Sequence, residues 1–257
     1  MISRSRARDG HRDLVSGVHA EIRDLIVCGQ LAPGARIVEA TVARRMGVSR
    51  TPVRAALLRL QQEGYVVGAI RAHRARPMVA ALTLEDAREL FTIQGEIEGV
   101  AAERAALLPA AQRRALVAAL RRLNDEYLAA ARDPHPALDT LFSVNAQFHQ
   151  TLFAAGAGPR LEALHAAIEP QTERYIRVYH RAKLDAIHPA VKEHRIIISA
   201  VRARAASAAQ SAVRSHWRNV VTRLERWIDL RGDIGAADSW TAARPAVARR
   251  AQRGSVL

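Results

Sequence analysis

Apolar residues recur every three or four positions through residues 83–230, and this spacing makes most of the chain helical. The clearest stripe, in the last segment, is Val213, Trp217, Val220, Leu224 and Trp227. Alanine, leucine, arginine and glutamate dominate the region, and all four are strong helix formers. We therefore predict an antiparallel bundle of about six helices. The predicted helices cover 83–106, 109–132, 136–155, 159–182, 185–204 and 206–230.

Local signals set the ends of these helices. Thr83 followed by Asp86 has the spacing of a capping box, in which the first side chain accepts a hydrogen bond from a backbone amide three residues on. Gly156 is typical of a helix end. Pro170 lies inside the fourth predicted helix, where it is expected to kink the helix or interrupt it.

The N-terminal third follows another pattern. A first helix ends near Gly29, a turn follows at 30–35, and a short helix at 39–46 ends at Gly47. Ser49 is placed to cap a third helix that runs to about residue 63. Two short strands, at 65–67 and 77–80, enclose a basic loop. This order predicts a winged helix-turn-helix, so the fold as a whole is expected to be mainly α.

Charge separates the same two regions. The 257-residue chain carries 39 Lys and Arg against 25 Asp and Glu, a net charge of +14. Residues 1–80 hold 14 basic and 6 acidic side chains, whereas 81–235 hold 21 and 18. A polyanionic partner is therefore expected for the N-terminal third. The predicted organisation is a disordered tail at 1–11, a winged domain at 12–80, a helical domain at 81–232, and a flexible basic tail at 233–257.

Several classes of protein are excluded by composition. The single cysteine, Cys28, excludes an intramolecular disulfide framework and a four-thiolate zinc site. The Arg-rich start lacks the apolar core of a secretory signal. The longest apolar runs, such as 66–70 and 196–201, are too short to span a bilayer. We therefore expect a cytoplasmic protein with no membrane partner.

The third helix has the features of a DNA-reading helix. Arg50 and Arg54 are four residues apart, so they lie on one face near the helix start, where they can reach guanine edges or phosphates. Ser49 and Thr51 can donate to phosphate beside the helix N-terminus. The alternative is a solvated basic helix in an unrelated bundle.

The basic loop between the strands adds three arginines, Arg71, Arg74 and Arg76, and His73. These side chains can enter a minor groove or bind phosphates. The alternative is a solvated loop with no DNA contact.

Residues 12–80 resemble the DNA-binding domain of the GntR family of bacterial transcription regulators. The matching stretches are 31–34 (LAPG), 47–54 (GVSRTPVR), 56–57, 59–60 and 63–66 (EGYV). The resemblance implies that Arg50 and Arg54 contact an operator. Two features depart from the family: Ala55 stands where glutamate is usual, and the loop at 68–76 is longer and lacks the usual glycine at its tip.

The helical region holds four polar residues on apolar stripes. Asn145 and His149 lie on the third predicted helix, His194 on the fifth and His216 on the last, and all four are expected to point inward. Three imidazoles and an amide oxygen from three helices can hold a transition metal. The alternative is that the histidines only form hydrogen bonds within the core.

Residues 83–230 resemble the FCD domain, the helical ligand-binding module named after the C-terminal domain of FadR. The matching stretches are 145–149 (NAQFH), 193–197 (EHRII) and 213–216 (VRSH). The resemblance implies a divalent metal held by Asn145, His149, His194 and His216. Asn145 replaces the commoner aspartate, so weaker binding or a softer ion is expected, with zinc, nickel and manganese as candidates.

The first predicted helix of this domain departs from the family in its effector-binding residues. Gln94 stands where members commonly have an arginine that holds a carboxylate effector, four residues before Glu98. Without that arginine, Glu98 needs another partner, and Arg174, Arg177 and Arg181 are the candidates. Tyr175 is expected in the pocket wall. Each of these residues has the alternative of a solvated helix face.

Three functions remain in competition. The first is a homodimeric regulator that binds a roughly palindromic double-stranded DNA operator and responds to a small molecule, possibly a carboxylate; we expect a repressor, although an activator has the same sequence features. The second is a metal-dependent enzyme using the His149/His194/His216 site. The third is a non-specific basic nucleic-acid binder. The sequence shows neither a carboxylate pair beside the histidines nor a G-x-S-x-G nucleophile motif, and residues 81–235 are close to neutral. These features favour the regulator over an enzyme or a non-specific binder.

Overall fold

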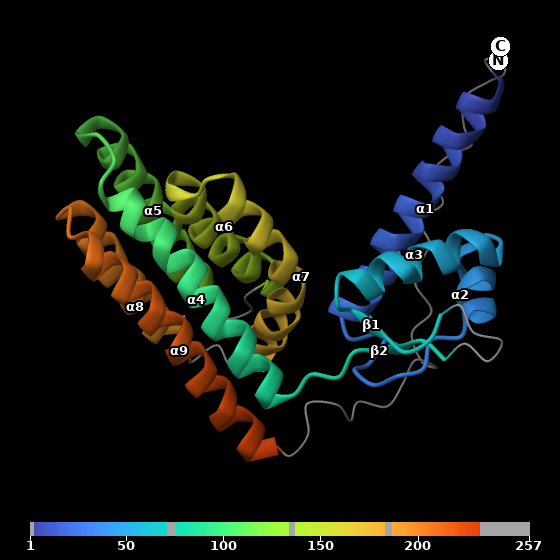
Figure 1. Cartoon of the computed structure of the whole chain (residues 1–257). Helices are drawn as coiled ribbons and strands as arrows, with labels where there is room; N and C mark the ends of the chain where they lie inside the picture. Colours follow the sequence, from blue (N-terminus) through green and yellow to red (C-terminus); the bar gives the residue numbers. More distant parts are fainter. Residues whose placement is uncertain (1–2, 71–75, 134–136, 183–186, 232–257) are drawn as a thin grey trace, which may run out of the picture.

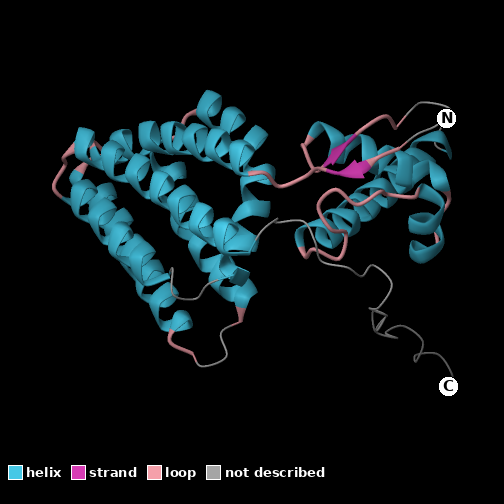
Figure 2. Cartoon of the chain, turned by 90° about the horizontal axis from the view of Figure 1, so that it is seen from below, coloured by secondary structure: helices cyan, strands magenta, loops and turns pink. Residues whose placement is uncertain are grey.

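The structure, a computed structural model, describes residues 3–70, 76–133, 137–182 and 187–231. It forms two lobes: a winged domain at 3–80 and a helical domain at 84–231 (Figure 1). The described strands both lie in the smaller lobe, and helices make up the larger one (Figure 2). No helix among the described residues has the length and apolar character needed to cross a membrane.

The winged domain has the predicted order of elements. It comprises α1 (Ser3–Val27), α2 (Glu39–Met46), α3 (Arg50–Gln62), β1 (Val66–Val67) and β2 (Met78–Val79). The strands are antiparallel, with Val66 opposite Val79. A bridge between Arg36 and Met78 adds the segment before α2 to the other edge of β2. The winged helix-turn-helix prediction is confirmed.

Glycines in the left-handed region allow the turns of this domain, among them Gly47 and Gly68. Gly47 ends α2 in the left-handed conformation, with φ of 66°. Gly68 has φ of +90°, and a Cβ there would lie 2.5 Å from the carbonyl oxygen of Arg76, across the base of the wing. Side chains of α1 and α3 fill the core beneath, among them Ile22, Val53 and Leu57.

The first helix begins earlier than the sequence suggests. A disordered tail was expected at 1–11, whereas α1 starts at Ser3. Arginine and alanine recur through this stretch, and both are helix formers, so the residues present are compatible with the longer helix. The expected C-terminal tail at 233–257 lies outside the described residues.

The helical domain contains the six expected helices, and the all-helical prediction is confirmed. They are α4 (Leu84–Ala106), α5 (Ala110–Ala131), α6 (Leu138–Gly156), α7 (Pro159–Ala182), α8 (Ile187–Arg202) and α9 (Ala206–Arg231). Thr83 caps α4 as predicted, because its Oγ1 accepts a hydrogen bond from the amide of Asp86 at 3.2 Å. Helix α7 continues through Pro170 without a break.

Helix α4 lies at the centre of the bundle and packs along α9 (Figure 1). Gly95 makes this approach close, since a Cβ on it would meet Trp217 Cβ at 3.4 Å. Phe91 stacks on the Trp217 ring with centroids 5.5 Å apart. The aromatic and aliphatic side chains around this pair form the main core of the domain.

Gly156, the last residue of α6, lies directly against α4. A Cβ at this position would be 1.9 Å from the carbonyl oxygen of Ala101, which is backbone and cannot swing aside. We expect Gly156→Ala to push α4 and α6 apart and to lower the free energy of unfolding by about 1–3 kcal/mol in urea denaturation. Gly17→Ala is the control, because a Cβ there has nothing within 4 Å. Equal losses in both variants would contradict this packing.

Candidate metal and effector site

Three buried histidines meet between α6, α8 and α9. His149, His194 and His216 each offer a ring nitrogen, and these three atoms lie within 4.8 Å of one another. The ring centroids are 5.3 Å apart for His149 and His194, 4.9 Å for His149 and His216, and 5.0 Å for His194 and His216. His194 is fully buried. The inward orientation predicted from the stripes therefore brings the three imidazoles together.

Each imidazole is oriented by an oxygen on its Nδ1 side. His149 Nδ1 lies 3.0 Å from Glu98 Oε2, His194 Nδ1 lies 3.1 Å from Asn124 Oδ1, and His216 Nδ1 lies 2.7 Å from Glu193 Oε2. An Nδ1–H that donates to such an oxygen leaves the Nε2 lone pair free for another partner. The Nε2 atoms of His149 and His194 are buried and have no hydrogen-bond partner within the described part of the chain.

Burial keeps two of these rings neutral. It lowers the pKa of His194 well below its ordinary value, with His216 and His149 nearby. Burial also lowers the pKa of His216 to about 4, against the opposing effect of Glu193. Burial raises the pKa of Glu193, but hydrogen bonds from His216 and Arg223 outweigh it and bring that pKa down to about 2. A neutral imidazole is the form that binds a metal.

The histidine cluster fits a transition metal. Zinc–imidazole bonds are about 2.0–2.1 Å and tetrahedrally arranged, so two nitrogens on one ion are about 3.4 Å apart. The three ring nitrogens lie within 4.8 Å of one another, so holding one ion requires them to close by at most about 1.4 Å. Two orphaned, buried Nε2 atoms are costly unless they find a partner, and a cation supplies one. Asn145, one turn before His149 on α6, lines the adjoining cavity.

A cavity of about 290 Å³ adjoins this cluster. Four of the predicted site residues line it: Gln94, Glu98, Asn145 and His149. Further lining comes from α6, α7, α9 and one residue of the winged domain: Phe142, Ala146, Gln150, His165, Glu169, Thr172, Glu173, Ile176, Trp217 and Arg23. The volume and the mixture of aromatic and polar walls suit a small polar ligand.

Glu98 is the buried anion of this cavity, and its partners differ from the arginines that the sequence suggested. Its carboxylate accepts hydrogen bonds from Gln94 Nε2, from His149 Nδ1 and, at 2.8 Å, from Trp217 Nε1. His165 Nε2 lies 3.5 Å away. Burial acts to raise the pKa of Glu98, but His149 and His165 outweigh it and hold the pKa well below its usual range. Gln94 Oε1 has no partner among the described residues.

Arg174 and Tyr175 lie elsewhere, at the junction of the two domains. Arg174 Nη2 donates to the carbonyl oxygen of Ala80 at 2.6 Å. The Tyr175 hydroxyl donates to Asp86 Oδ2 at 2.6 Å and accepts from the Thr83 amide at 3.0 Å. These two side chains therefore anchor the linker and the start of α4 and do not line the cavity.

Sequence reasoning missed further residues that line the cavity, among them His165, Glu173 and Arg23. His165 follows Leu161 by four residues and precedes Ile168 by three, so the apolar periodicity of α7 contains a signal for it. Glu173 also belongs to α7. Arg23 comes from α1, and no local pattern indicates that it reaches a cavity of the other domain.

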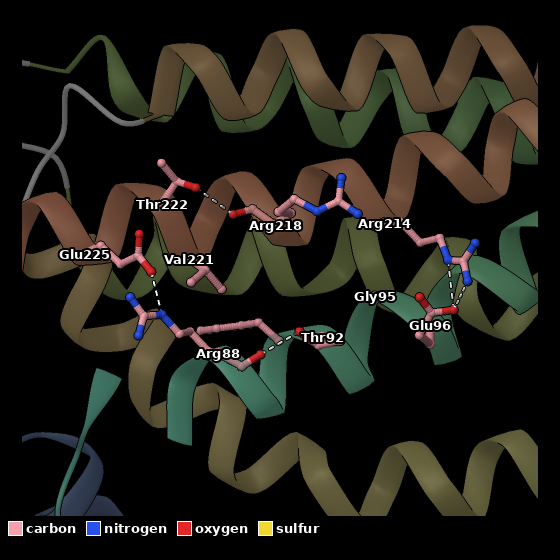
Figure 3. Close-up of a pocket in the computed structure, with 10 residues that line it drawn as sticks. Arg88, Thr92, Gly95, Glu96, Arg214, Arg218, Val221, Thr222 and Glu225 are labelled. Atoms are coloured by element: carbon pink, nitrogen blue, oxygen red, sulfur yellow. Dashed lines mark hydrogen bonds and ion pairs between the residues drawn. The ribbon is translucent and has the colours of Figure 1, made fainter. Parts of the chain in front are cut away.

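A second hollow lies on the α4–α9 face and has a volume of about 340 Å³. Figure 3 shows two of its arginines paired with glutamates across the two helices. Arg88 Nε lies 2.7 Å from Glu225 Oε1, and Arg214 Nε lies 2.8 Å from Glu96 Oε2. Since the histidines do not border this hollow, the cavity beside the cluster is the candidate effector site.

The face of α3 that carries the predicted DNA-binding residues is open to solvent. Ser49, Arg50, Thr51 and Arg54 are exposed, while the opposite face of the helix is buried in the core. On the wing, Arg76 is exposed, and Arg71 and Arg74, with His73, lie outside the described residues. The structure thus presents both arginines of α3 on one accessible surface.

Glu39, the first residue of α2, ties these two arginines together. Its carboxylate accepts from Arg54 Nε at 3.1 Å, from Arg54 Nη2 at 2.8 Å and from Arg50 Nη2 at 3.3 Å. The Arg54 hydrogen bond is the main cause that lowers the pKa of Glu39 from its ordinary value. The Glu39 side chain is 5% exposed, whereas those of Arg50 and Arg54 are 64% and 48% exposed.

Comparison with known proteins matches each domain to a known family. Residues 14–71 match the family described as bacterial regulatory proteins, gntR family, and residues 89–219 match the FCD domain. An uncharacterized HTH-type transcriptional regulator from the TAR-I ttuE-ttuC' intergenic region of Agrobacterium vitis is 33% identical over 147 residues, which are 56% of this chain and 81% of that protein.

Two further similarities span most of the chain. An uncharacterized HTH-type transcriptional regulator in an unstable DNA locus of Streptomyces ambofaciens is 29% identical over 248 residues, covering 93% of this chain and 95% of that protein. The solved structure of E. coli McbR/YncC has a TM-score of 0.64 at 20% identity, over 83% of this chain and 97% of that one. At this identity the structural similarity supports the fold alone.

Proposed function

Because this chain belongs to the GntR family of bacterial regulatory proteins and carries an FCD domain, we propose that it is a transcriptional regulator controlled by a small molecule. The winged domain binds double-stranded operator DNA, and the helical domain binds the effector. The observation that carries this proposal is a single cavity bordered by the histidine cluster on one side and by α1 of the winged domain on the other. Because a regulator of this kind acts on chromosomal DNA, we propose that the protein lies in the cytoplasm.

The exposed face of α3 is the part we assign to the operator. Its N-terminal end enters the major groove, where Arg50 and Arg54 bind guanine edges or phosphates. Ser49 and Thr51 bind phosphate beside the helix N-terminus. The wing arginines Arg71, Arg74 and Arg76 bind the adjoining backbone or minor groove.

We propose a homodimer formed by the helical domains, with repression as its mode of action. Two winged domains related by a two-fold axis match two half-sites, so the operator is roughly palindromic. An effector that binds one relative placement of the winged domains more tightly than another shifts the population towards it. The effect on operator affinity is limited by that difference in binding free energy.

In the helical domain, His149, His194 and His216, with Asn145 beside them, would hold a divalent transition metal such as zinc, nickel or manganese. When bound, such a cation would supply a positive charge that favours an electronegative atom of the effector. The Glu98, Asn124 and Glu193 oxygens orient the three rings for this role.

We do not propose a catalytic role for the histidine cluster. Glu98, the buried carboxylate beside it, accepts hydrogen bonds from three neighbouring side chains and is not free to act as a base. The family and the relatives that match are transcription regulators, which are not enzymes.

Thermal shift with two successive screens tests the effector half of the proposal. Zinc, nickel and manganese salts come first, followed by a panel of metabolites on the metal-treated protein. A molecule that binds the native state raises Tm. We expect such a metabolite also to change operator affinity in fluorescence anisotropy. A metabolite that raises Tm through this cavity and leaves operator affinity unchanged would contradict effector control.

Glu39 offers a test of how the reading arginines are held. In Glu39→Gln the charged partner of Arg50 and Arg54 is lost, so both side chains are less fixed and the local surface is more positive. We expect weaker discrimination between operator and random duplex, with random-sequence binding unchanged or tighter. Glu63→Gln is the control: its carboxylate is paired with His19 at 2.7 Å, in the same domain. A specificity ratio in Glu39→Gln equal to the wild type would mean that this pairing does not matter for reading.

A further inference from the structure

The cavity of the helical domain is lined by an arginine of the winged domain, Arg23. Its walls come from α4, α6, α7 and α9, with one residue, Arg23, from α1 of the winged domain. Among the described residues that line it, Arg23 is the only lysine or arginine. Gln94, at the position where the family resemblance led us to expect an arginine, is an uncharged amide. An anion inside this cavity therefore meets an arginine that belongs to the DNA-binding domain.

Arg23 is engaged with Glu173 of α7, and this pair joins the two domains. The Arg23 Nη2 donates to Glu173 Oε2, and its Nε donates to the Tyr65 hydroxyl at 3.0 Å. The same hydroxyl lies 3.4 Å from Glu173 Oε2. Figure 1 shows α7 as the helix of the bundle that faces the winged domain.

Glu173 remains paired if Arg23 leaves it. Arg177, one turn along α7, donates from its Nε to Glu173 Oε1 at 3.0 Å. The Glu173 side chain is 11% exposed, so losing every cation would leave a nearly buried charge uncompensated. With Arg177 in place, exchange of the Arg23 partner keeps Glu173 in an ion pair. Arg23 can thus exchange the Glu173 carboxylate for another carboxylate, and the new pair has the same chemistry.

We propose that the effector carries a carboxylate that binds Arg23 in place of Glu173, and that this exchange releases α1 from α7. The proposal rests on the proposed function and names the chemical class of its effector. Gln94 also lines this cavity, and its Oε1 is buried without a described partner, so it would accept a hydrogen bond from a hydroxyl or N–H group of the molecule. Such a donor would add to the affinity, but the carboxylate is the group that the proposal requires.

A second contact between the domains, made by Arg174 of α7, determines which part of the winged domain can move after the exchange. Arg174 donates to the Ala80 carbonyl and lies over the Tyr65 ring at 5.8 Å from its centroid. Neither of these contacts involves Glu173 or lies in the cavity wall. Exchange at Arg23 therefore frees α1 while the linker stays anchored, which changes the placement of the winged domain and not its attachment.

Calorimetric titration of the full chain tests the exchange. The probes are malonate, succinate, glutarate and adipate, with the diols of the same chain length as uncharged controls. We expect at least one dicarboxylate to bind and no diol to bind. Arg23→Gln should weaken that binding by at least about tenfold, the loss of one charge-assisted bidentate contact. Glu173→Gln should tighten it severalfold, because the competing carboxylate is gone.

The opposite directions of these two variants separate a ligand contact from a structural tie. If Arg23 and Glu173 only hold the domains together, both variants should shift dicarboxylate binding in the same direction, and the proposal fails. Arg88→Gln is the matched control, since Arg88 is also paired with a glutamate, Glu225 at 2.7 Å, but outside the cavity. It should leave binding within about twofold of the wild type.

Other outcomes are equally decisive. A diol that binds as tightly as the acid, or a wild-type protein that binds no dicarboxylate, overturns the assigned chemical class. If the protein nevertheless binds a specific DNA sequence, only this inference fails and the regulator remains. If the wild-type protein binds no DNA sequence specifically, the proposed function itself is contradicted.

Discussion

Replacing His194 by alanine should lower the affinity for zinc or nickel by at least about 100-fold, because a ligand contributes more than the orienting partner of a ligand, and partners alone contribute about 10–100-fold. His194 is the most buried of the three imidazoles and stacks on Phe148, with centroids 3.9 Å apart. Calorimetric titration of the metal-stripped protein measures the change, with circular dichroism to confirm the fold.

A milder variant keeps this prediction testable if the alanine protein does not fold. Asn124→Ala removes only the oxygen that orients His194 Nδ1, so a loss of about 10–100-fold is expected. His188→Gln is the control, because that imidazole is exposed on the same helix as His194 and is not part of the cluster. Equal metal affinity in the wild type and His194→Ala would show that the three histidines only form hydrogen bonds within the core.

Asn145→Asp should act in the opposite direction. The carboxylate adds one negative charge beside the imidazoles, so a divalent ion is expected to bind more tightly. If no metal binds at sub-millimolar concentration to the wild type or to this variant, the site is not metallic, and the effector is held by the protein's own side chains.

Arg54→Ala should weaken specific operator binding without unfolding the winged domain. A bidentate base contact contributes about 1–3 kcal/mol, which corresponds to a loss of roughly 5- to 150-fold in affinity. The side chain is 48% exposed and is not part of the core, so the melting temperature should change little. Arg50→Ala should behave in the same way, with a smaller effect if it binds phosphate alone.

Arg59→Ala is the matched control on the same helix. Arg59 donates to Ser16 Oγ at 3.3 Å and points away from the reading face, so operator affinity should stay near that of the wild type. Anisotropy titrations at one fixed salt concentration compare the three variants, since phosphate contacts make every affinity depend on salt. Unchanged operator affinity in both Arg50→Ala and Arg54→Ala would remove α3 from the role of reader.

The helices were predictable because their signals are local. Apolar residues at helical spacing and prolines or glycines between segments placed all six helices of the helical domain. The end of α8 shows the limit: we expected residue 204, and the helix ends at Arg202. Arg204 takes a left-handed φ of 59°, a conformation that glycine usually signals, so the sequence gives no warning of this end.

Within the site, the ligands were predictable but their partners were not. The stripes of three helices point His149, His194 and His216 inward, and the structure gathers them. Asn124 and Glu193 orient two of these rings from positions that depend on how α5, α8 and α9 pack. Packing of this kind is set by long-range contacts, which periodicity along one helix does not encode.

The contact between the domains lies furthest from what the sequence can predict. Arg23 and Glu173 are 150 residues apart and belong to different domains. Nothing beside either residue distinguishes it from other charged side chains on a helix surface. Arg174 and Tyr175 illustrate the converse, since they neighbour Glu173 in α7 yet point to the linker and the start of α4.

The central claim is that this chain reads a DNA sequence, and selection from a random duplex library tests it most directly. The full chain is incubated with the library, bound DNA is recovered over several rounds, and the enriched sequence is compared with random duplex in anisotropy. We predict a roughly palindromic consensus, bound about 10³-fold or more tightly than random DNA. A library without an enriched consensus, bound only through salt-sensitive contacts, would show that the basic winged domain binds phosphate without reading bases.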